Sequence, residues 1–222
     1  MFSMSCNKIV YSALTLAMVF NSAMAFATEG ERTITLQEDV SQAELLRLDV
    51  PAGDVEIVGA TGNGLTAVVT AVCQKENREN CYQLIKELSW SKKIGTVTEL
   101  SLSPSSLTRY DHITIKVKLG VPKDKKLEVS LSAGELSIEG TSACLTAEVN
   151  AGQINIKLKE NQLASAELNT KVGDAKLVNA QGHTIEGERS LLVGAHLEWN
   201  KGTGTCHTKA SVLAGEAQLV LN

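Results

Sequence analysis

Short segments in which apolar and polar side chains alternate fill most of the chain. In the stretch LEVSLSAGELSIEG (127–140), Leu136 and Ile138 alternate with Glu135 and Ser137. A period of two residues is that of a β-strand with one face buried, whereas a helix repeats every 3.6 residues. The pattern therefore predicts β-strands, and an all-β fold class for the chain.

The alternating pattern recurs as an internal repeat with a glycine in a fixed phase. A glycine between two short strands at each repeat indicates a backbone that needs positive φ or a tight corner. A period of ~20 residues is too short for a strand plus a crossover helix, so each repeat is one coil of strands and turns. We predict a single-domain β-solenoid or β-roll over residues 46–222, with the coils stacked in chain order. A β-sandwich with glycines in its hairpin turns is the alternative. The repeat glycines are Gly53, Gly134, Gly152, Gly173, Gly194 and Gly215, and the last five are 18, 21, 21 and 21 residues apart.

An insert of about residues 65–121 departs from the repeat. Leu65–Cys73 and His112–Leu119 alternate like strands and fit the same sheet system. Glu76–Leu88 has apolar residues at helical spacing with polar residues between them. We predict one short helix there, which covers the flank or an end of the solenoid.

The first 25 residues have the pattern of a signal peptide. An apolar run, Ile9–Phe20, follows a single lysine, and Ala23–Ala25 matches the small-residue pattern of a cleavage site. We expect residues 26–45 to form an N-terminal lead-in to the solenoid. The sequence has no second apolar run, so we expect no transmembrane segment. The prediction is an exported protein, located in the periplasm, on the cell surface or outside the cell.

The four cysteines that follow the signal peptide divide into two pairs. Cys73 and Cys81 close a short loop between a strand and the predicted helix, and we predict a structural disulfide between them. Cys144 and Cys206 share nearly the same phase of the repeat but lie three coils apart in chain order. At ~4.8 Å per coil, that is about 14 Å, beyond the ~7 Å over which two Cα atoms can be bridged. We predict that both are reduced, buried thiols; a bridge between them would mean that the coils do not stack in chain order.

Composition and motifs argue against several function classes. The net charge is −4 without a basic block, which predicts no binding to nucleic acid. No zinc-ligand spacing, serine-hydrolase elbow or phosphate loop is present, and aromatic residues make up only 4% of the chain. We predict that the protein is not an enzyme, with no catalytic residue, cofactor or metal. The residues after the repeat glycines would form one mostly acidic column, which could bind calcium, but the calcium-binding β-roll motif is absent. The column is Asp54, Glu135, Gln153, Asp174, Ala195 and Glu216.

The repeated motif L-x-V-x-(small)-Gly-(Asp/Glu)-(Val/Leu)-x-Ile carries a resemblance to a known family. It occurs in LRLDVPAGDVEIVG (46–59) and LEVSLSAGELSIEG (127–140). With it the chain resembles the bacterial putative-adhesin domain family of exported β-solenoid proteins. The resemblance implies a non-enzymatic envelope protein whose repetitive surface contacts a protein or a glycan, and it supplies no site residues.

Two further hypotheses concern partners. The first is a periplasmic accessory or scaffold protein that binds its partner through the disulfide-tied insert around Tyr82 and Trp90. The second is self-association through the C-terminal coil. The chain ends at Leu219–Asn222 without an obvious polar cap, and an uncovered coil exposes a strand edge that can pair with another copy.

Overall fold

The computed structural model describes residues 26–222 except 29, 75–77, 107–109, 111, 142–143 and 191–192. The predicted signal peptide, 1–25, lies outside the described residues. The N-terminal half contains β1 (Phe26–Thr28), β2 (Glu31–Asp39), β3 (Leu45–Ala60), β4 (Gly64–Cys73), α1 (Arg78–Glu87), β5 (Ser89–Lys93), β6 (Val97–Ser103), β7 (Ile113–Pro122) and β8 (Lys126–Glu139). The C-terminal half contains β9 (Leu145–Leu158), a 3₁₀ turn (Glu160–Gln162), β10 (Leu163–Val178), β11 (Thr184–Glu186), β12 (Glu188–Ser190), β13 (Gly194–Trp199) and β14 (Cys206–Leu221).

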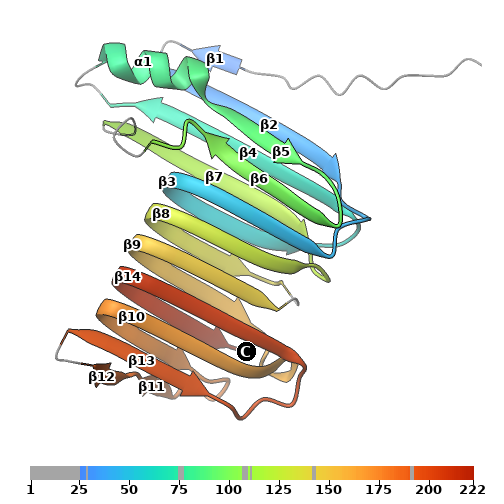
Figure 1. Ribbon diagram of the computed structural model, residues 1–222, viewed down its shortest axis with the longest axis vertical. Coiled ribbons are helices and arrows are strands. Elements are labelled where there is room, and N and C mark those ends of the chain that lie inside the picture. Colours follow the sequence, from blue (N-terminus) through green and yellow to red (C-terminus); the bar gives the residue numbers. More distant parts are fainter. Residues whose placement is uncertain are drawn as a thin grey trace, which may run out of the picture.

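The described strands form one large mixed sheet. Along it the order is β1-β2-β4-β7-β3-β8-β9-β14-β10-β13-β12, with β5, β6 and β11 attached at its sides. The five long strands β3, β8, β9, β14 and β10 pair in parallel, and antiparallel strands lie at both ends (Figure 1). The prediction of a mostly β chain with one short helix is confirmed. The five long repeat strands do not form the hairpins of the alternative β-sandwich, because they pair with one another in parallel.

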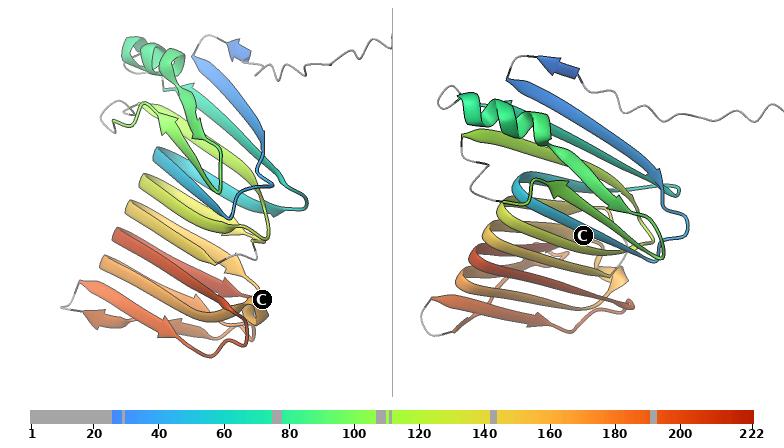
Figure 2. Two further views of the ribbon diagram at one scale, coloured as in Figure 1. Left: turned by 45° about the vertical axis from the view of Figure 1, so that its right-hand side comes forward. Right: turned by 45° about the horizontal axis from the view of Figure 1, so that its top comes forward.

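Each long strand bends at its repeat glycine and buries apolar side chains on both sides of the bend. In β8 the buried residues are Leu127, Val129 and Leu131 before the bend and Leu136 and Ile138 after it. The step of five residues between Leu131 and Leu136 shifts the alternation by one, so both arms of the strand face the same core. Figure 2 shows the two arms of the stacked strands folded toward each other around this interior.

The stacking order departs from the order of the chain at β14. This C-terminal strand lies between β9 and β10, and both of its edges are paired. The prediction of coils stacked in chain order is therefore wrong. The premise of the predicted self-association, an uncovered edge on the C-terminal coil, is wrong for the same reason, since β14 pairs with a strand on each side. The five long strands have the same phase, so β14 fits the register between β9 and β10 as well as it would fit a terminal position.

The ends of the sheet consist of short strands. At one end β1 covers part of β2, and at the other β12 and β13 lie beyond β10 (Figure 1). Short antiparallel edge strands limit pairing with other chains. Both the N-terminal stretch, through β2, and the insert, through β4 and β7, belong to the same sheet as the repeats.

Candidate binding surface

Five of the six repeat glycines form a ladder across the parallel strands. Register pairs them in the order Gly53, Gly134, Gly152, Gly215, Gly173, and each has a φ between +127° and +139°. They also approach one another closely. A Cβ added to Gly152 would lie 1.7 Å from the carbonyl oxygen of Gly134. No other residue type fits this position, because both the backbone angle and the contact exclude a side chain.

Gly194 does not belong to this ladder, which corrects the sequence prediction. It begins β13, which runs antiparallel to β10, and it pairs with Ser190 of β12. Its φ lies outside the positive region, although an added Cβ would still meet the carbonyl of Thr170 at 2.6 Å. The 21-residue spacing of Gly194 from its neighbours therefore does not place it at a bend.

The residues that follow the ladder glycines lie in register, as the acidic column requires. Their carboxylates are in contact with lysine, arginine and asparagine side chains. Lys176 Nζ contacts Glu216 Oε1 at 2.8 Å and Arg189 Nη2 contacts Asp174 Oδ1 at 2.6 Å. The hydrogen bond to Glu216 raises the pKa of Lys176. Ala195 lies outside the column because it pairs with Thr170. Among the described residues no group of three or more histidine, cysteine or acidic side chains could hold a metal ion.

A groove crosses the outer surface of β9, β14 and β10 just before the bend. One cross-strand row, Glu148, Ser211 and Asn169, pairs residue by residue. Lys171 and Leu213 continue the lining toward the bend, and the groove has a volume of about 460 Å³. The short serine on β14 forms a low floor between the longer side chains of the two neighbouring strands. A carboxylate and an ammonium group thus lie in one groove with polar groups between them.

The polar side chains beside the groove are held in place by hydrogen bonds. Asn169 Nδ2 donates to Glu167 at 2.9 Å, and its Oδ1 lies 3.1 Å from His196 Nδ1. The other ring nitrogen of His196 lies 3.2 Å from Glu198. These contacts fix the rotamer of Asn169, which reduces the entropy that would be lost when a ligand binds.

Three exposed aliphatic side chains lie near the bend, beside the groove. Leu213, Val172 and Val193 have exposed fractions of 48, 53 and 54%. Leu213 precedes Ala214, which pairs with Val172, and the carbonyl of Val193 accepts a hydrogen bond from Gly173. The three therefore lie on adjacent segments of β14, β10 and the approach to β13. We call them the aliphatic ridge.

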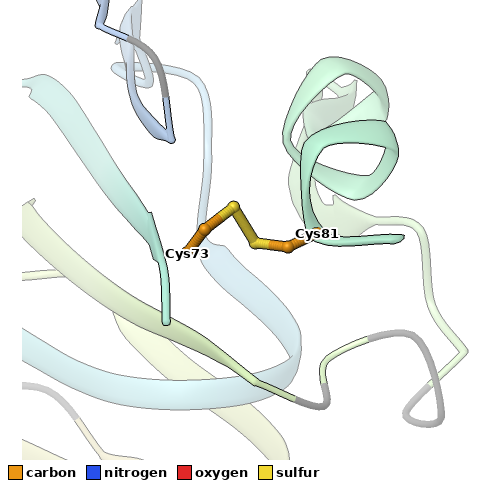
Figure 3. Close-up of a disulfide and its surroundings, with 2 residues drawn as sticks. All are labelled: Cys73 and Cys81. Atoms are coloured by element: carbon orange, nitrogen blue, oxygen red, sulfur yellow. A yellow bond between two sulfur atoms is a disulfide. The ribbon is translucent and has the colours of Figure 1, made fainter. Parts of the chain in front are cut away.

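The insert is fastened to the sheet at two points. Cys73 at the end of β4 is bonded to Cys81 in α1, with 5.7 Å between the Cα atoms (Figure 3). The guanidinium of Arg32 donates to the carbonyls of Ile85 and Lys86 at 2.5 and 2.6 Å. These carbonyls lie in the last turn of the helix, where a cation is favourable. The helix is thereby held against β2 and β4.

The two aromatic residues that the sequence offers for partner binding are partly used in packing. Tyr82 lies against the Gly30 turn, and Trp90 packs against the core. The indole N–H of Trp90 is buried without a hydrogen-bond partner among the described residues. The insert therefore exposes less aromatic surface than its sequence predicts.

Cys144 and Cys206 lie next to each other rather than three coils apart, which corrects the sequence prediction. Burial and, after it, the neighbouring Cys144 thiol raise the pKa of Cys206 to about 11. Both cysteines carry thiols and are half-buried, not fully buried. The insertion of β14 beside β9 brings them together.

Comparison with known proteins gives a similarity of fold. No protein-family model matches the chain, and no curated protein matches it. The structure is similar to the crystal structure of a putative cell adhesion protein from Clostridium sporogenes ATCC 15579, with a TM-score of 0.53 and 10% sequence identity. The match covers 86% of this chain and 100% of that one. The structural resemblance to putative adhesins that the repeats predict is thus found, and at this identity it shows a shared fold.

A second solved structure gives a weaker match. A putative adhesin from Parabacteroides merdae ATCC 43184 matches at a TM-score of 0.31 and 12% identity, over 66% of this chain and 61% of that one. Among the residues that the structure describes, no helix is both long enough and apolar enough to cross a membrane.

Sequence reasoning did not find the groove or the aliphatic ridge. Each depends on β14 lying between β9 and β10, because Ser211 and Leu213 come from β14 and their neighbours from the other two strands. The available signal was Leu213 and Val172, exposed apolar residues that interrupt the alternation two and one positions before a repeat glycine.

Proposed function

We propose that the chain is a non-enzymatic, exported envelope protein, an adhesin-like β-solenoid whose repetitive surface contacts a protein partner. Residues 1–25 act as the export signal, and the disulfide between Cys73 and Cys81 fits an oxidising compartment. The observation that carries the proposal is the pairing of the groove with the aliphatic ridge. Exposed aliphatic side chains beside fixed polar groups are typical of protein-binding surfaces.

A protein partner is favoured over a glycan by the groove lining. The residues that line the groove include no aromatic side chain, so a sugar would find no flat apolar ring to stack on. Leu213 and Val172 instead suit aliphatic side chains of a partner. Lys171 suits an acidic group of the partner, and Glu148 suits a basic group.

The test compares retention of the protein on envelope preparations from its organism of origin. Leu213→Asp places a charge on the ridge, and Val58→Asp is the matched control. Val58 is also an exposed aliphatic residue, at 43%, but it lies on β3, after the bend, whereas Leu213 lies on β14, before the bend. We expect saturable retention of the wild-type protein and the control, and at least tenfold weaker retention of Leu213→Asp.

Treatment of the envelope preparation identifies the class of partner. Loss of retention after protease treatment, but not after periodate oxidation of sugars, supports a protein partner. Loss after periodate alone would replace the protein partner by a glycan. Equal retention of both variants would overturn the assignment of the surface, and no retention of the wild-type protein would overturn the binding function.

Protease treatment of intact cells, with an osmotic-shock fraction beside it, determines the location. Digestion on intact cells supports direct adhesion. Protection until the outer membrane is opened would contradict adhesion at the cell surface and support an accessory role in the periplasm.

A further inference from the structure

The strand order brings together two cysteines that the sequence separates by 62 positions. Cys206 is the first residue of β14, and Cys144 directly precedes β9. The two strands run parallel, and Leu145 pairs with Thr208. The cysteines therefore lie at the same end of two adjacent strands.

The distance between the two backbones suits a disulfide. Adjacent strands lie about 4.8 Å apart and one residue of offset adds about 3.3 Å along the strand, so the two Cα atoms are roughly 6 Å apart. Disulfides join Cα atoms at roughly 4.4–6.8 Å. The Cys144 thiol contributes to the raised pKa of Cys206, which agrees with the closeness that the strand register gives.

We propose that Cys144 and Cys206 form a second disulfide in the exported protein, which links β14 to β9. The bond between Cys73 and Cys81 shows that this chain carries a disulfide elsewhere. The half-buried positions of Cys144 and Cys206 leave them accessible to an oxidant.

The oxidant is a disulfide, such as glutathione disulfide or the disulfide of a thiol-oxidising protein. One cysteine thiolate attacks a sulfur of that disulfide, releases one thiolate and leaves a mixed disulfide. The second cysteine thiolate attacks the cysteine sulfur of the mixed disulfide, forms the new bond and expels the second thiolate. The two cysteines lose two protons and two electrons in total, and the oxidant is reduced to two thiols.

The new bond would fix the strand that forms the floor of the groove. Ser211 and Leu213 lie on β14, which contacts only β9 and β10 as strand neighbours. A covalent link between Cys144 and Cys206 closes a loop that contains β9 to β13. It therefore opposes the withdrawal of β14 from its place between β9 and β10.

Peptide mapping tests the proposal directly on the wild-type protein. The purified protein is reduced, incubated with glutathione and glutathione disulfide, alkylated and digested with trypsin without further reduction. Cleavage after lysine and arginine separates all four cysteines, into peptides 48–75, 79–86, 127–157 and 202–209. We expect 127–157 linked to 202–209 and 48–75 linked to 79–86, both within a single chain.

Three outcomes would overturn the proposal. In the first, Cys144 and Cys206 are both alkylated while the Cys73–Cys81 link is intact. In the second, Cys144 or Cys206 is linked to peptide 48–75 or 79–86. In the third, the link joins two chains. The matched variants Cys144→Ser and Cys206→Ser should each lose only the new link. On oxidation the melting temperature of the wild-type protein should rise by roughly 5–10 °C more than those of the variants, which form only the bond between Cys73 and Cys81.

This test does not depend on the proposed binding function. The link is measured in a defined glutathione buffer, so it can fail while retention on envelopes succeeds, and the reverse. The location of the protein decides only which oxidant acts in the cell.

Discussion

The glycine ladder makes a quantitative prediction about Gly152, the central member of the stack. Gly152→Ala introduces a Cβ at a φ of +138°, 1.7 Å from the carbonyl oxygen of Gly134. Because non-bonded atoms need roughly 3.5 Å between them, the two strands must separate locally by nearly 2 Å. The backbone hydrogen bonds beside the bend would then be lost.

Two other glycines separate the two causes of this destabilisation. Gly62 also has positive φ, at +92°, but nothing lies within 4 Å of an added Cβ. Gly64 has neither a positive φ nor a close neighbour. Gly62→Ala therefore measures the backbone cost alone, and Gly64→Ala measures the background effect of the substitution.

The expected free energies follow from these contacts. Backbone strain at positive φ costs about 1–3 kcal/mol, and forcing an atom into a packed position adds about 1–3 kcal/mol. We expect Gly152→Ala to lower the free energy of unfolding by about 4 kcal/mol, Gly62→Ala by about 1 kcal/mol and Gly64→Ala by less than ~0.5 kcal/mol. The first loss is a large part of the ~5–15 kcal/mol that stabilises a typical protein.

Urea unfolding followed by tryptophan fluorescence measures these differences. Trp199 is a suitable probe, because it is only 4% exposed and lies in the same sheet as the ladder. The comparison uses the urea midpoint together with the slope of the transition. Equal midpoints for Gly152→Ala and Gly62→Ala would refute the close approach as the reason for the ladder.

Three further predictions concern the strand order, the helix and the thiols. Deletion of residues 206–222 should leave the protein insoluble or unfolded in circular dichroism, because it removes the strand between β9 and β10; a folded product would contradict the strand order. Arg32→Ala should speed hydrogen exchange in α1 by about tenfold without changing exchange in β8, since the helix loses two side-chain hydrogen bonds at its last turn. Burial raises the pKa of Cys206 to about 11, the hydrogen bond to Cys144 adds to the shift, and Lys126 opposes it. The stability of the reduced protein should therefore be complete below about pH 9 and fall as the pH rises to about 11, because the unfolded state releases this proton first. Thermal melts should show that fall, and Cys206→Ser should lack it.

The position and the buried face of most strands could be predicted from the sequence. Alternation in 127–140 placed Leu136 and Ile138 in the core, because a strand buries every second side chain whatever its neighbours are. The same argument found β4 and β7, and apolar residues at helical spacing found α1. The spacing of Cys73 and Cys81 predicted their bond, since a short loop keeps the two residues close in any fold.

The sequence could not predict which strands are neighbours. The repeats have the same phase and edges that can pair with any other repeat, so nothing local distinguishes a place at the end of the sheet from one inside it. Gly194 has the spacing of a bend glycine, yet it begins an antiparallel strand.

The sequence by itself thus determined the strands, the bends at the ladder glycines and the disulfide of the insert, because each depends on side chains close together in the chain. Only the tertiary structure decided that β14 lies between β9 and β10. That placement results from the backbone hydrogen bonds of two open strand edges, which are independent of side-chain identity. The groove, the aliphatic ridge and the contact between Cys144 and Cys206 all follow from it.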